Sequence, residues 1–91
     1  YAAFFEEQGI EFVTEPRFAR SNYWLNAIIL QDRATRDQYV EYTNQCGVMT
    51  RPAWRLLNTL PMFQGCQTDG LAQARWLEER IANIPSSAIP I

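Results

Sequence analysis

The eight residues YWLNAIIL, at positions 23–30, give the strongest indication of regular structure in the chain. Aromatic and β-branched side chains dominate this stretch, and both of its alternating faces are largely apolar, which is typical of a strand buried on both sides. Only Asn26 interrupts the apolar run, and a buried amide at that position needs hydrogen-bond partners. We therefore expect a central strand at residues 23–30, covered on both of its faces.

The residues before this strand indicate a helix, a short strand and a loop. Residues 2–8 are good helix formers, and Gly9 can adopt the left-handed conformation that ends a helix. Residues 10–14 alternate between apolar and polar, as a half-buried strand does, and Pro16 stops the pattern. The early helix and the absence of an initiating methionine lead us to expect a piece of a longer protein.

A second helix is expected after the central strand. The series from Thr35 to Gln38 fits a capping box, in which the two side chains bond free backbone amides at a helix start. The helix then runs from about residue 36 to 45 and ends at Gly47. Its expected apolar stripe consists of Tyr39, Val40, Tyr42 and Cys46.

An irregular segment follows this helix. Residues 48–50 predict a short strand that ends at Pro52, and residues 53–67 show no long period. A loop of that length in a compact domain is usually functional or disordered. Its apolar content argues against disorder, and comes from Trp54, Leu56, Leu57, Leu60, Met62 and Phe63.

The last part of the chain indicates a third helix. Thr68 or Asp69 can cap a helix over residues 71–82, after which residues 83–87 leave it in an extended form. The apolar residues at helical spacing are Leu71, Ala74, Leu77 and Ile81. The order of elements predicts an α+β fold for residues 1–91, a single domain with a small sheet of about three strands and helices packed mainly on one face.

Composition excludes several classes of function. The chain has 91 residues, a net charge of −2 and no histidine, and all eight basic residues are arginine. Without His or Lys it lacks the commonest general base and any Schiff-base nucleophile. The scattered arginines give no basic stripe for nucleic acid, and no apolar run is long enough to span a membrane. Cys46 and Cys66 match neither a zinc motif nor a disulfide framework, so we expect reduced cysteines, no metal site and a cytoplasmic location.

The residues around Arg51 are the candidates for a binding site. Pro52 biases Arg51 to an extended conformation, which fixes its position at the sheet edge, where a guanidinium can clamp a carboxylate or phosphate. From the residues alone, a surface salt bridge to one of the ten acidic residues is the simpler explanation of Arg51, and Trp54 is either a core residue or a stacking surface. The clusters at residues 22–24 and 54–58 both lie at predicted strand ends, where α/β folds host ligands, and we expect them to converge.

Paired carboxylates and serines offer no catalytic alternative. The pairs at residues 6–7 and 78–79 lie on exposed helix faces by their periodicity, and residues 86–87 are serines with no histidine or lysine to activate them. The sequence therefore indicates no catalytic residue in this chain.

Three segments carry a resemblance to a known family. They are SNYWLNAIIL at residues 21–30, GVMTRPAWRLLNTLPMF at residues 47–63 and ARWLEERIANIPSS at residues 74–87. Together they resemble the C-terminal part of DegT/DnrJ/EryC1/StrS sugar-nucleotide aminotransferases, and most closely the subgroup serving legionaminic acid, bacillosamine and perosamine-type sugars. These enzymes use pyridoxal phosphate to install an amino group on a keto-sugar attached to a nucleoside diphosphate.

The resemblance implies a role for the chain within a larger enzyme. It would be the C-terminal small domain of a fold-type I aminotransferase, which helps to close the active site and contacts the nucleotide-sugar substrate. The large domain, absent from this chain, would carry the pyridoxal phosphate and its lysine, would meet the amino-acid donor and would build most of a homodimer. The fragment would be inactive alone and would bind no cofactor itself.

The resemblance also implies substrate-binding residues. The family has a Tyr or His followed by a PLH tripeptide where this chain has AWRLLN, so Trp54 stands near the aromatic position and Asn58 near the histidine. The implied lining residues, none with a role in proton transfer, are Thr50, Arg51, Trp54 and Asn58. The alternative function is a non-catalytic protein-interaction domain with an exposed aromatic loop.

Overall fold

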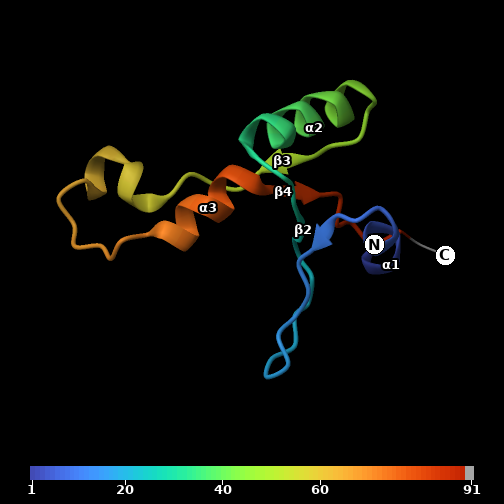
Figure 1. Ribbon diagram of the computed structural model, residues 1–91, viewed down its shortest axis with the longest axis horizontal. Coiled ribbons are helices and arrows are strands. Elements are labelled where there is room, and N and C mark those ends of the chain that lie inside the picture. The colour runs from blue at the N-terminus through green and yellow to red at the C-terminus, as the bar shows by residue number, and fades with distance from the viewer. Residues whose placement is uncertain (90–91) are drawn as a thin grey trace.

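The computed structural model describes residues 1–89 and shows an α+β fold, as the sequence predicts (Figure 1). Three α-helices, two short 3-10 helices and a four-stranded sheet make up this part of the chain. In chain order the elements are α1 (Ala2–Glu7), β1 (Glu11–Phe12), β2 (Asn26–Ile29), α2 (Arg33–Gln45), β3 (Arg51–Pro52), η1 (Leu57–Thr59), η2 (Pro61–Phe63), α3 (Ala72–Arg80) and β4 (Ile81–Ile84).

The sheet has the order β1-β2-β4-β3, and every neighbouring pair is antiparallel. The predicted central strand is confirmed in β2, although it begins only at Asn26 because Tyr23 adopts a left-handed backbone with φ of 50°. The sheet has one strand more than expected, because β4 is a full central strand. The predicted helix through residue 82 is wrong there: α3 ends at Arg80, and the next residue already pairs with β2.

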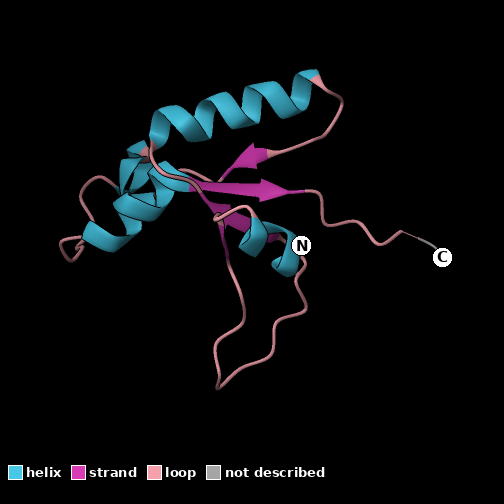
Figure 2. Ribbon diagram, turned by 45° about the vertical axis from the view of Figure 1, so that its right-hand side comes forward, coloured by secondary structure: helices cyan, strands magenta, loops and turns pink. Residues whose placement is uncertain are grey.

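The core lies on one face of the sheet. Ile28 and Ala82 are completely buried and stand opposite each other in β2 and β4. Phe5 from α1 joins them, with Tyr39 and Val40 of α2 packed against the cluster. Figure 2 shows α2 lying along one side of the sheet. Helices therefore pack mainly on one face, as predicted, and the expectation of a strand covered on both sides is wrong.

The other face of the sheet carries no comparable helix packing among residues 1–89. Because side chains alternate along a strand, the registers place on this face the residues that lie between the buried ones. We call it the open face, and the registers place on it Glu11, Ala27, Ile29, Arg51, Ile81 and Asn83. Val13, whose backbone N–H donates to the carbonyl oxygen of Ala27, adjoins this face, as do Leu25 and Met49.

The two predicted glycine stops are confirmed, whereas the predicted start of α2 is wrong. Gly9 and Gly47 have φ of 69° and 81° and follow the ends of α1 and α2. The capping residue of α2 is Asp32, whose Oδ1 accepts a hydrogen bond of 2.7 Å from the backbone N–H of Thr35. A carboxylate already positioned at the helix start leaves Thr35 inside the first turn instead of at the cap.

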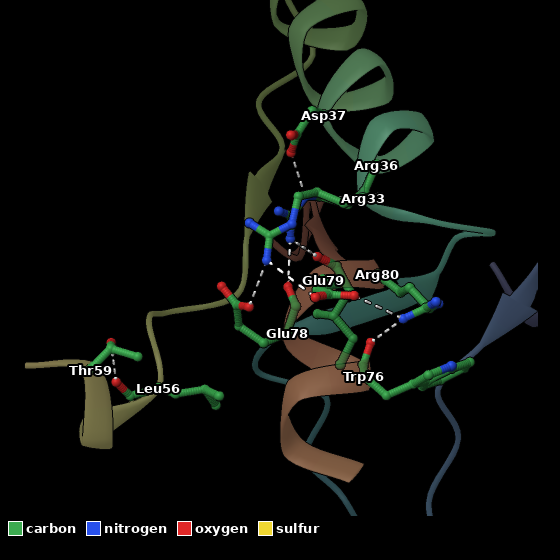
Figure 3. Close-up of polar contacts among 10 residues, drawn as sticks. Arg33, Arg36, Asp37, Leu56, Thr59, Trp76, Glu78, Glu79 and Arg80 are labelled. Carbon is green, nitrogen blue, oxygen red and sulfur yellow. Dashed lines mark hydrogen bonds and ion pairs between the residues drawn. The ribbon is translucent and has the colours of Figure 1, made fainter. Parts of the chain in front are cut away.

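The buried stripe of α2 also differs from the expected one. Tyr42 is 67% exposed and Cys46 is exposed as well, while Arg36 is only 5% exposed. The Arg36 guanidinium donates to the carbonyl oxygen of Glu78 at 2.7 Å and to the Asp37 carboxylate at 2.8 Å (Figure 3). It thereby satisfies a carbonyl at the C-terminal end of α3 and ties α2 to the junction between α3 and β4.

The strand predicted at residues 48–50 is found at Arg51–Pro52 instead. β3 pairs Arg51 with Asn83 and Pro52 with Ala82, so the proline belongs to the strand instead of ending it. β3 is an edge strand, so the side of Pro52 that lacks an N–H group can face away from the sheet. The proline therefore costs the sheet no hydrogen bond.

Residues 53–67 are irregular, as predicted, apart from η1 and η2. Asp69 contributes to the start of α3, because its Oδ1 accepts from the backbone N–H of Leu71. In Figure 1 the irregular segment at residues 53–67 extends away from the sheet beside α3. Among the helices of residues 1–89, none combines the length and the apolar character needed to cross a membrane.

Replacing Arg36 with methionine tests the polar junction. Met fills much of the same volume but leaves the partly buried carbonyl of Glu78 without its donor, so we expect the free energy of unfolding to fall by about 2 kcal/mol. Urea denaturation followed by circular dichroism measures the change. The matched control is Arg75→Met on the exposed side of α3, and an equal loss in both variants would contradict a special role for Arg36.

The cap of α2 predicts a dependence of stability on pH. The hydrogen bond from the Thr35 backbone N–H holds the pKa of Asp32 below its ordinary value of 3.8. Its contribution is therefore complete above that value and is lost as the pH falls through the lower pKa of the folded state. We expect Asp32→Ala to lower the urea midpoint at pH 7, with the difference from wild type vanishing in acid. Glu41→Ala, in the middle of α2, is the control, and a difference that persisted at low pH would contradict the role of the charged cap.

Candidate functional site

A hollow of about 620 Å³ opens at one end of the open face, beside β3 and the end of β4. It contains an arginine, two tryptophans and several small polar groups. The lining residues are Trp24, Leu25, Met49, Arg51, Pro52, Trp54, Asn83, Ile84, Pro85, Ser86 and Ser87. The predicted convergence of residues 22–24 with residues 54–58 is confirmed in one respect, because Trp24 and Trp54 both line this hollow.

The register of β3 decides which side chain reaches the hollow. Arg51 stands opposite Asn83, which in turn stands opposite Ala27, so all three lie on the open face. Thr50 precedes Arg51 and therefore points to the other side of the sheet. Pro52 restricts the backbone of Arg51 to extended conformations and so holds this arrangement.

The guanidinium of Arg51 has no carboxylate partner within residues 1–89. Its one side-chain contact of hydrogen-bond type is with Sδ of Met49, at 4.0 Å, and no ion pair within this part of the chain includes it. The explanation of Arg51 as a partner in a surface salt bridge is therefore not supported within residues 1–89. A free guanidinium on a mostly apolar surface is available to clamp an external anion.

The two tryptophans present their rings to solvent instead of to the core. Trp24 is 72% exposed and Trp54 is 76% exposed, which excludes the interpretation of Trp54 as a core residue. The backbone N–H of Trp24 donates to Oδ1 of Asn22, and this turn fixes where the first ring leaves the chain. Exposed indole rings at the mouth of a hollow are suited to stacking on a flat ring or on the apolar face of a sugar.

The other polar side chains of the hollow differ in whether they are free to bind a ligand. The hydroxyl of Ser86 accepts from the backbone N–H of Asn26 at 2.8 Å and donates to the carbonyl of Ile84, so it closes the end of the sheet. The side chain of Asn83 makes no hydrogen bond to any of residues 1–89, so its amide is available to a ligand. Asn83 was missed at the sequence level because it lay in a segment expected to be merely extended, although it separates two buried residues.

Thr50 lies in a different environment from the hollow. It is only 3% exposed, and its Oγ1 lies 2.6 Å from Oγ1 of Thr43 in α2. The side-chain amide of Asn44 donates to the Thr50 carbonyl oxygen at 3.0 Å. Thr50 therefore joins β3 to α2 on the covered face.

Asn58 is also outside the hollow. It is half-buried in η1, on the segment that leads away from the sheet. Of the four residues implied by the resemblance, the hollow brings together Arg51 and Trp54 and does not include Thr50 or Asn58.

The chemistry available in the hollow is binding. No carboxylate, histidine, lysine or cysteine is among its lining residues, so it offers no general base and no activated nucleophile. The groups with shifted pKa values lie elsewhere: burial raises the pKa of Tyr39, and a hydrogen bond with Cys46 raises that of Tyr42. Within residues 1–89, no three His, Cys, Asp or Glu side chains gather closely enough to hold a metal ion.

Comparison with known proteins adds no assignment. No protein-family model matches the chain, and a search of curated proteins likewise finds no match.

Replacing Thr50 with valine tests its structural position. Valine keeps the shape but removes the hydroxyl that bonds Thr43, so we expect the free energy of unfolding to fall by about 1 kcal/mol. Thr50→Ser retains the hydroxyl and serves as the matched variant in the same urea titration. A valine variant as stable as wild type, beside a destabilised serine variant, would show that packing instead of the hydrogen bond matters at this position.

Proposed function

We propose that this chain is the substrate-binding C-terminal small domain of a pyridoxal-phosphate-dependent aminotransferase acting on a nucleotide-linked 4-keto sugar. The observation that carries the proposal is the free guanidinium of Arg51 beside the exposed rings of Trp24 and Trp54 in one hollow. The resemblance of residues 22–87 to the C-terminal part of such enzymes supports the same assignment.

The hollow suits the chemistry of a nucleotide sugar. Such a ligand combines a diphosphate, a flat base and a pyranose ring with an apolar face. A guanidinium binds a phosphate through two parallel hydrogen bonds, and an indole ring stacks on either ring type. The unoccupied amide of Asn83 adds a donor and an acceptor for a sugar hydroxyl.

The residues of this chain do not fit pyridoxal phosphate itself. The chain contains no lysine to bind the cofactor covalently, and its hollow has no carboxylate for the pyridine nitrogen. We therefore assign the cofactor, the amino-acid donor and all proton transfers to a separate large domain. In this proposal the small domain binds and orients the sugar nucleotide, excludes water from one side of the active site and has no activity alone.

Substitutions in the hollow test the proposal in the enzyme that carries this domain. We expect Arg51→Ala to raise the KM for the sugar nucleotide about tenfold or more, because it removes a charged hydrogen-bond donor to phosphate. Trp54→Ala should weaken binding by a similar factor through the loss of a stacking surface. Arg55→Ala, an exposed arginine outside the hollow, is the matched control. Unchanged kinetics in both hollow variants would remove this site from the reaction.

The reading frame upstream of Tyr1 provides an independent test. A lysine-bearing cofactor domain directly before this residue supports the proposal. A frame without such a domain overturns it and favours the second candidate.

The second candidate is a non-catalytic protein-interaction domain. The segment after β3 favours it, because Leu57 and Met62 are exposed there together with Trp54, on a stretch that extends away from the sheet. This candidate predicts that the 91-residue chain binds a protein partner with no upstream sequence and has no affinity for nucleotide sugars.

A further inference from the structure

The folded chain exposes far more surface than a compact monomer of its mass. Its accessible surface is 7573 Å², whereas a monomeric protein of 10.6 kDa exposes about 5,500 Å². Its radius of gyration is 15.0 Å, against about 12 Å for a compact domain of this length. The excess of roughly 2,000 Å² is more than twice what each partner buries in a standard protein complex. The chain therefore exposes more surface than a compact monomer does, and the open face is part of that surface.

The open face is the largest apolar part of the sheet that no helix covers among residues 1–89. Its centre consists of the half-buried side chains of Ala27, Ile29 and Ile81, with the exposed Val13 and Leu25 around them. Two sheets with apolar faces of this kind can pack together about 10 Å apart, as in a β-sandwich.

Two charges without ion-pair partners within residues 1–89 lie at opposite edges of this face. Glu11 is in β1 at one edge and Arg51 is in β3 at the other. Glu11 stands opposite Ile29, which pairs with Ile81, while Arg51 stands opposite Asn83. The two charges are therefore displaced along the strand direction by two residues, or about 7 Å.

We propose that the open face binds a second copy of this chain, with a two-fold axis parallel to the strands. A rotation about such an axis places β1 of each copy over β3 of the other. Glu11 of one copy then faces Arg51 of the second copy, and the same pair forms again on the other side. The long side chains of glutamate and arginine span both the gap between the sheets and the 7 Å displacement.

The charges also exclude the other face-to-face arrangement. A two-fold axis perpendicular to the strands, in the plane between the sheets, would place Glu11 of one copy near Glu11 of the other, and Arg51 of one copy near Arg51 of the other. Like charges facing each other across an apolar interface are strongly unfavourable. The charge pattern thus selects one of the two symmetric arrangements.

This inference does not rest on the proposed function, since it uses the packing of the sheet and no nucleotide. The two share Arg51, so a phosphate in the hollow and Glu11 of the second copy would compete for one guanidinium. The tests are therefore carried out without nucleotide, and Glu11, which does not line the hollow, is the main residue changed.

Sedimentation equilibrium of the 91-residue chain tests the dimer. We expect a monomer–dimer equilibrium whose dissociation constant rises about tenfold or more in Glu11→Arg and in Arg51→Glu, because each places like charges opposite each other twice. Glu11→Gln, a milder change, should weaken the dimer by a smaller factor. The controls Glu7→Arg in α1 and Arg75→Glu in α3 reverse charges outside the open face and should leave the dissociation constant unchanged.

Charge exchange supplies the decisive measurement. In a mixture of the two single reversal variants, both cross-pairs again unite opposite charges, so the heterodimer should form with nearly the wild-type dissociation constant. A single chain carrying both reversals should recover dimerisation for the same reason. A wild-type chain that stays monomeric, or reversal variants that associate like wild type, would overturn the proposal.

Discussion

The alternation of side chains along β3 and β4 is the constraint on which both the core and the hollow depend. Ala82 and Ile84 point into the core, so Asn83 between them must point to the open face. At the start of β3 the same alternation ties Thr50, the residue before the strand, to α2 and directs Arg51 to the opposite side. A slip of one residue in this pairing would bury the arginine and expose the threonine, so the register that builds the core also builds the site.

Polar junctions complement a small apolar core. Only five hydrophobic side chains are buried among residues 1–89, too few to hold three helices by apolar contact alone. Specific polar contacts add to the apolar ones: Arg36 connects α2 to α3, and Thr43 with Asn44 connects α2 to Thr50, directly before β3. Within residues 1–89 every buried side-chain nitrogen or oxygen has a hydrogen-bond partner, so these junctions leave no unmatched group.

The sequence predicts those features that depend on local backbone preference and misses those that depend on distant partners. Gly9 and Gly47 end their helices because few other residues adopt a positive φ without strain. Ile81 fits the spacing of a helix and of a strand equally well, and only the neighbouring β2 decides between them. Likewise, Pro52 ends an internal strand but belongs in an edge strand, and the strand order is not a local property. In the candidate site, the shared position of Trp24 and Trp54 was predictable because both lie near strand ends. The position of Thr50 on the covered face could be predicted only from the pairing register of β3 with β4, which the sequence does not reveal.

The free guanidinium of Arg51 limits what can cover the open face. A purely apolar surface packed over it would remove water from a charge without replacing its hydrogen bonds, which is unfavourable by several kcal/mol. A surface or ligand that brings an anion to Arg51 avoids this cost and still gains from burying the apolar side chains beside it. The phosphates of a nucleotide sugar and the carboxylate of Glu11 from a second copy both satisfy that condition. The choice between them depends on which anion reaches the guanidinium with the better geometry.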